Sequence, residues 1–153
     1  MERHVIGFLR AALLWLLFGT ALGFTMAVHP AWIVYRPVHV HAMLLGFVTM
    51  FIAGVGYHVL PRFSGTGLAS PRLADLHLLV ANVGLVVLEC GFIARVRAGH
   101  LAPTLLAIGG TLSLVGAWML VWNLWRTLAR AILPSRPTPR SRPVPVSSPP
   151  RGS

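Results

Sequence analysis

The residues best suited to chemistry in this sequence are its seven histidines, because the chain around them is otherwise strongly apolar. Ionisable side chains are costly inside a membrane, so histidines in an apolar protein indicate a functional site. Imidazole is a common axial ligand of haem iron and also binds copper and zinc. His39 and His41 begin a long apolar segment, and Met43 follows them closely. This segment therefore predicts a metal or haem site.

The spacing of these residues predicts which faces of a helix they share. His39 and His41 are two residues apart, about 200° of rotation on an α-helix, so they are not expected to share one ion. The face of His39 continues through Met43 and Gly46, which leave room for a flat group against the helix. Glycine has a second interpretation here, because small residues also let helices pack closely.

A second set of polar residues lies further along the chain. Asp75, Asn82 and Glu89 recur every seven residues and form one polar stripe on a helix. We interpret this stripe as a polar helix seam, with a proton route as the alternative. Glu89 is expected to pair with Arg95 or Arg36, or to accept a hydrogen bond from a ligating histidine.

His77 lies on the opposite face of the same predicted helix from Asp75, among small and apolar residues. His58 is its expected neighbour, because it ends the preceding helix across a short loop. His77 and His58 are therefore candidates for a second cofactor or metal site.

The elements that position these residues are predicted to be transmembrane helices. The chain is 56% hydrophobic and 10% charged, whereas soluble domains carry about 25% charged residues. About 20 apolar residues span a bilayer as a helix, and short loops make neighbouring helices antiparallel. We expect an all-α, four-helix antiparallel bundle within residues 1–130, with helices at about 5–28, 38–60, 73–93 and 103–125.

The arginines predict the orientation, since cytoplasmic loops carry an excess of basic residues. Both termini are expected in the cytoplasm, with the protein in a bacterial-type inner membrane. Residues 131–153 are rich in proline, arginine and serine and predict a disordered tail. The alternative for the first segment is a cleaved signal peptide, which would leave three helices.

Several classes of function are disfavoured. The net charge of +10 comes from arginines at segment ends and in the tail, so no nucleic acid is expected as a partner. Cys90 is the only cysteine, which excludes an internal disulfide and c-type haem attachment. Motifs of zinc proteases, serine hydrolases and phosphate-binding loops are absent from the sequence.

The stretch from His39 to Phe47, with the sequence HVHAMLLGF, resembles the corresponding helix of the NnrS family, which are membrane haem–copper proteins of nitric oxide metabolism. It is also similar to the second helix of subunit I of the haem–copper oxidases and nitric oxide reductases. The resemblance continues through Ala53-Gly54 to the segment 60–65, LPRFSG. It covers mainly residues 36–65, about a fifth of the chain.

The resemblance implies that His39 is an axial ligand of a noncovalently bound haem b, with copper as a second candidate cofactor. It leaves the role of His41 open. The other haem and copper ligands of those oxidases lie on later helices. The second axial ligand is then expected from another protomer, a partner subunit, or one of four histidines, which are His29, His58, His77 and His100. The positions of His58 and His77, at the far end of the bundle from His39, favour a second site.

The sequence therefore predicts a membrane haem b protein related to oxidoreductases of the cytochrome oxidase type, acting in respiratory electron transfer or in oxygen or nitric oxide chemistry. One alternative is a copper- or zinc-binding membrane protein that uses His29, His39, His41 and Met43. The other is an accessory or assembly subunit of a respiratory complex without its own cofactor. Expected partners are membrane lipids and either further copies of the chain or a larger respiratory complex.

Overall fold

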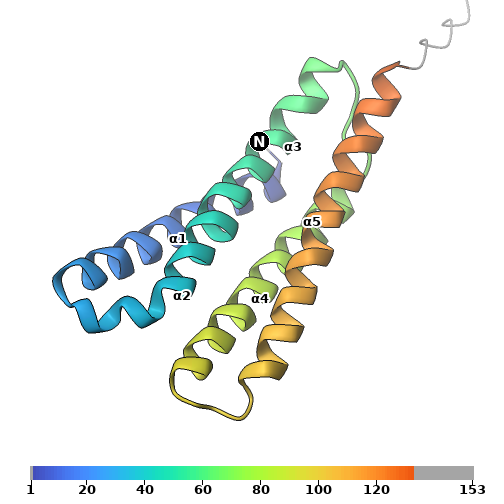
Figure 1. Cartoon of the computed structure of the whole chain (residues 1–153). Helices are drawn as coiled ribbons and strands as arrows, with labels where there is room; N and C mark the ends of the chain where they lie inside the picture. The colour runs from blue at the N-terminus through green and yellow to red at the C-terminus, as the bar shows by residue number, and fades with distance from the viewer. Residues whose placement is uncertain (1, 133–153) are drawn as a thin grey trace, which may run out of the picture.

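The computed structural model describes residues 2–132, and these residues are helical almost throughout (Figure 1). The first helix is α1 (Arg3–Val28), and the last two are α4 (Pro71–Val96) and α5 (Ala102–Ile132). Between them, one continuous helix consists of four parts, which are η1 (Pro30–Tyr35), α2 (Arg36–His41), the π-helical segment η2 (Ala42–Thr49) and α3 (Met50–Phe63). All four long helices have the length and composition of membrane spans, which confirms the predicted fold class.

Each helix is longer than the sequence predicts. The largest difference is at residues 30–37, which were expected in a loop and are helical. Pro30 and Pro37 lie in first turns, where the missing N–H of proline costs no hydrogen bond, so neither interrupts the helix. The last helix continues beyond Trp125 to Ile132, since this stretch is rich in helix-favouring leucine, alanine and arginine. The tail predicted for residues 131–153 lies outside the described residues, apart from the end of α5.

The helices form two hairpins, α1 with the η1–α3 helix and α4 with α5 (Figure 1). Glycines set the close packing of the second hairpin. A Cβ atom on Gly84 would lie 2.9 Å from the backbone nitrogen of Ser113, and one on Gly91 would lie 2.9 Å from that of Leu106. Small residues let helix backbones approach closely in membranes, so α4 and α5 pack with their backbones nearly in contact.

The loop between α3 and α4 is fastened to α5 by buried polar side chains. The amide of Asn123 accepts a hydrogen bond from the backbone nitrogen of Ser70 at 3.0 Å and donates one to its carbonyl oxygen at 2.8 Å. The hydroxyl of Thr127 accepts from the backbone nitrogen of Ala69 at 3.0 Å. The side chain of Ser70 also caps the first turn of α4. These bonds hold the two hairpins together at one end.

The buried apolar core lies where α1, α3 and α4 meet. Its largest members are Phe8 and Tyr57, which are 0% and 2% exposed. We call this end of the bundle the Arg3 end, since α1 begins there, and the opposite end the His39 end. Large apolar side chains are exposed along all four helices, including Leu14 and Trp125. This surface fits a lipid environment, in which exposed apolar residues have no cost.

Candidate functional site

His39 contacts α1 through a single defined hydrogen bond. Its Nδ1 lies 2.8 Å from the carbonyl oxygen of Gly19. A carbonyl oxygen only accepts, so Nδ1 carries the proton and donates it. The lone pair of the neutral imidazole is therefore on Nε2. Metal-ligating histidines commonly have this arrangement, in which the second ring nitrogen donates to a carbonyl and fixes the tautomer.

Glycines of α1 make the space that the His39 ring occupies. A Cβ atom on Gly23 would lie 2.8 Å from Cε1 of His39. Any larger residue at position 23 would displace the ring. The oriented imidazole and the glycine cradle fit one axial ligand of a haem iron.

His41 points away from His39, as its spacing predicts. Its Nδ1 lies 2.8 Å from the carbonyl oxygen of Pro37 in the same helix. Its ring packs on Phe92 of α4, with ring centroids 4.7 Å apart. His39 thus faces α1, while His41 faces α4, and the two are not brought together at one ion.

The space expected beside the helix face of His39 is occupied by side chains. Met43 packs over Gly19, where a Cβ atom would lie 2.6 Å from its sulfur. Gly46 lies against the indole of Trp15, and a Cβ there would be 2.5 Å from Cγ of the indole. The glycines therefore serve close helix packing, the second of the two interpretations. Room for a flat group beside Gly46 was expected and is instead taken by Trp15.

His77 belongs to a separate buried cluster at the Arg3 end. Its Nδ1 is 3.1 Å from the hydroxyl of Tyr57, and its ring lies 4.7 Å from that of Phe8. His77 and Tyr57 are both 2% exposed, and the ring of His4 meets Tyr57 edge-on at 5.7 Å. His77, Tyr57 and His4 come from three different helices, so the cluster joins α1, α3 and α4.

His58 has a different partner from the one expected. Its Nδ1 is 2.7 Å from a guanidinium nitrogen of Arg62, one turn later in α3. The polar neighbour of His77 is Tyr57 instead. The sequence offered one signal for Tyr57, because it follows His39 by 18 residues, or five helical turns, and so lies on the same predicted face as His39, Met43 and Gly46. Tyr57 follows His39 by about 27 Å of continuous helix, so His77 and His39 cannot ligate the same iron.

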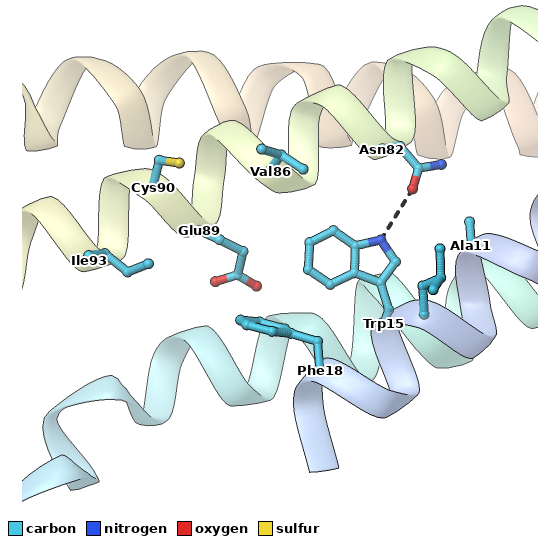
Figure 2. Close-up of a pocket in the computed structure, with 9 residues that line it drawn as sticks. Ala11, Trp15, Phe18, Asn82, Val86, Glu89, Cys90 and Ile93 are labelled. Atoms are coloured by element: carbon cyan, nitrogen blue, oxygen red, sulfur yellow. Dashed lines mark hydrogen bonds between the residues drawn. The ribbon is translucent and has the colours of Figure 1, made fainter. Parts of the chain in front are cut away.

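The polar stripe of α4 is present, but its three members have different surroundings. Asp75 is 61% exposed and lies 3.7 Å from His4. Asn82 accepts a hydrogen bond from the indole nitrogen of Trp15 at 3.2 Å (Figure 2). Glu89 is 4% exposed, and neither carboxylate oxygen has a hydrogen-bond partner within residues 2–132. The expected pairing of Glu89 with an arginine or a ligating histidine is therefore not found there.

Trp15 is a site residue that the sequence reasoning missed. Tryptophan in membrane proteins is enriched at the interfaces, and a buried indole N–H usually has a partner. Trp15 lies in the interior of the first apolar segment, so its indole N–H could have been expected to need a polar partner there. In the structure that partner is Asn82.

Ligands for a bound metal ion are not clustered in the part of the chain that the structure describes. Within residues 2–132, no three histidine, cysteine, aspartate or glutamate side chains lie together as an ion site. His39 and His41 face different helices, so these two members of the predicted copper or zinc group do not share one ion.

Comparison with known proteins gives consistent matches. The family profile of cytochrome c and quinol oxidase polypeptide I matches residues 3–146. The cytochrome c oxidase subunit 1 homolog, bacteroid, of Bradyrhizobium diazoefficiens is 31% identical over 115 residues, which cover 59% of this chain and 21% of that protein. The cbb3-type cytochrome c oxidase subunit CcoN1 of Stutzerimonas stutzeri is 27% identical over 118 residues, with 61% and 25% covered.

A third relative, the cytochrome c oxidase subunit 1 homolog of Azorhizobium caulinodans, is 28% identical over 125 residues, which cover 65% of this chain and 23% of that protein. The chain thus spans between about a fifth and a quarter of the length of these curated relatives. No solved structure matches it. The match of the family profile to nearly the whole chain, on a fold of four membrane-spanning helices, shows that this protein belongs to the family of cytochrome c and quinol oxidase polypeptide I.

Proposed function

We propose that this chain binds haem b in the membrane and takes part in respiratory electron transfer, with His39 as an axial ligand through Nε2. The observation that carries the proposal is the hydrogen bond from Nδ1 of His39 to the Gly19 carbonyl. It selects the tautomer that a metal ligand needs and holds the ring in one orientation. A bound haem would supply one-electron redox chemistry, or gas binding at an open coordination position.

The residues of α1 have the positioning role in this proposal. Gly19 holds the proton-bearing nitrogen of His39, and Gly23 gives the ring its space. A ligand held by a backbone carbonyl does not depend on the rotamer of another side chain. Axial-ligand orientation and the hydrogen bond to the ligand are two of the means by which a protein sets a haem potential.

The second axial ligand is proposed to come from a neighbouring subunit, from a second copy of the chain, or from His29 or His100 of this chain. His77 and His58 are too far along the bundle to reach the same iron, as the helix length from His39 to Tyr57 shows. The relatives are named as subunits of cytochrome c oxidases, which supports assembly into a larger respiratory complex. Oxygen or nitric oxide reduction by that complex, and a role of copper in it, are further parts of the proposal.

The test is a reduced-minus-oxidised absorbance spectrum of the full chain purified in detergent, with the haem-to-protein ratio. We expect a haem b spectrum that is lost in His39→Ala and kept in His41→Ala. His41→Ala is the matched control. It removes the same type of side chain only two residues from His39, at a position where the ring faces α4 and not α1.

His77→Ala should also keep the spectrum, since its ring lies in the separate cluster with Tyr57. Full haem content in the His39→Ala protein would refute the assignment. Purified wild-type protein without haem, but with stoichiometric copper or zinc, would favour the metal-binding alternative instead. Wild-type protein that binds neither would favour an accessory subunit.

A further inference from the structure

A pocket between α1 and α4 has no part in the proposed haem site. Its volume is about 470 Å³, within the range of about 300–1,000 Å³ that is typical of small-molecule pockets. The aromatic rings of Trp15 and Phe18 line it from α1, and Glu89, Cys90 and Ile93 line it from α4 (Figure 2). The lining is almost entirely apolar, so Glu89 is its distinctive group.

The carboxyl group of Glu89 is buried at this pocket and has no hydrogen-bond partner among residues 2–132. Glu89 is 4% exposed, and within residues 2–132 neither of its oxygens has a hydrogen-bond partner. A polar group buried in an apolar environment costs free energy unless a hydrogen bond compensates it. Asn82, by contrast, is satisfied, because it accepts from Trp15 and donates to the carbonyl oxygen of Leu78 at 2.8 Å. Of the three residues of the polar stripe, Glu89 is therefore the one whose side chain would be stabilised by a bound molecule.

The structure also limits the kind of partner. Ion pairs in the described part of the chain involve His4 and its acidic neighbours, and none reaches Glu89. Aromatic rings attract cations through their faces, and Trp15 and Phe18 lie beside the carboxyl group in Figure 2. An apolar body with a basic nitrogen thus complements both the walls and the carboxyl group.

We propose that this pocket binds a membrane-soluble alkylamine with an apolar body, which forms an ion pair with Glu89. The neutral amine enters from the bilayer, where it is soluble. The O–H bond of the protonated carboxyl group breaks, an N–H bond forms, and the proton ends on the amine nitrogen. The resulting carboxylate and ammonium have no net charge together, and their hydrogen bond is charge-assisted and stronger than a neutral one.

The amine site is separate from the His39 site. His39 contacts α1 at Gly19 and Gly23, whereas the pocket uses the neighbouring α1 face that carries Trp15 and Phe18. Loss of haem would therefore leave this proposal standing, and the reverse also holds.

Cys90 provides a reporter inside the pocket. It is the only cysteine in the sequence, it is exposed, and it follows Glu89 directly. The experiment measures the rate at which N-ethylmaleimide labels Cys90 in the full chain reconstituted into lipid nanodiscs. The ligands compared are dimethylbenzylamine and isobutylbenzene, in which a CH group replaces the nitrogen.

We expect the amine to slow labelling of the wild-type protein with a saturable concentration dependence. Its apparent affinity should exceed that of the hydrocarbon about tenfold or more, which corresponds to one hydrogen bond to a charged group. Equal protection by the two compounds, or no protection, would overturn the proposal.

The variant Glu89→Gln should abolish the preference for the amine, because the protons of an amide are too weakly acidic to pass to an amine. Asp75→Asn is the matched control, since it makes the same kind of change two heptads earlier in α4 and outside this pocket. Retained preference in Glu89→Gln would overturn the proposal. If Glu89→Gln does not fold, the wild-type comparison of amine and hydrocarbon decides the question by itself.

Discussion

Two adjacent glycines of α5 allow the cost of disturbing the packing between α4 and α5 to be predicted as a difference in unfolding free energy. A Cβ atom on Gly109 would lie 2.6 Å from Cα of Leu88, whereas one on Gly110 would meet nothing within 4 Å. Carbon atoms pack best at about 3.5–4.0 Å, so Gly109→Ala must push the two backbones apart by about 1 Å. Overpacking of this kind costs about 1–3 kcal/mol.

Gly110→Ala is the control that removes the effect of helix propensity. Replacing glycine by alanine in a helix gains up to about 1 kcal/mol at either position. The difference in unfolding free energy between the two variants therefore isolates the packing cost. We expect Gly109→Ala to be less stable than Gly110→Ala by about 1–3 kcal/mol.

The assay is unfolding of the purified protein in mixed micelles with increasing SDS, followed by far-ultraviolet circular dichroism. Equal midpoints for the two variants would refute the inference that the α4 and α5 backbones are in close contact. Greater stability of Gly109→Ala would refute it as well, since propensity alone would then decide the outcome.

Three further predictions concern the sites. Gly23→Ala should lower the haem-to-protein ratio, because the new Cβ would lie 2.8 Å from Cε1 of His39 and tilt the ring; an unchanged ratio would argue against this ring as the ligand. Tyr57→Phe should destabilise the protein by about 1–3 kcal/mol in the same SDS titration, since His77 loses its buried partner, while haem content stays constant. Asn123→Ala removes two hydrogen bonds to the α3–α4 loop and should speed its proteolysis; an unchanged cleavage rate would contradict the fastening role.

Much of the local geometry was predictable from residue spacing. His39 and His41 are confirmed on different faces, with α1 and α4 as their neighbours, because two residues rotate a helix by about 200° whatever packs around it. The glycines of the second helix were less predictable. The same small residue suits a flat cofactor or a close helix, and only the position of Trp15 against Gly46 distinguishes the two.

The partners of polar side chains were the least predictable part of the site. The spacing placed Glu89 on a polar stripe, and the predicted antiparallel helices would bring it near Arg36 and Arg95, yet its carboxyl group has no partner in the described residues. His58 was expected beside His77, but Tyr57 takes that place. Tyr57 and His58 are adjacent in α3, so a rotation of about 100° separates the side chain that reaches His77 from the one that does not. Sequence spacing does not give the rotation of one helix relative to another.

Composition and residue spacing were enough to predict the membrane environment, the four helices and the face on which each polar residue lies. These properties follow from residues close together in the chain, so no distant contact was needed to predict them. Which faces meet depends on how the helices pack, and residue spacing does not give that. Close glycine contacts, such as Gly46 against Trp15, fix the rotation and register of α1 against the helix that carries His39. That register holds His39 on the Gly19 carbonyl. The packing of α1 beside α4 leaves Glu89 at an apolar pocket without a hydrogen-bond partner within residues 2–132.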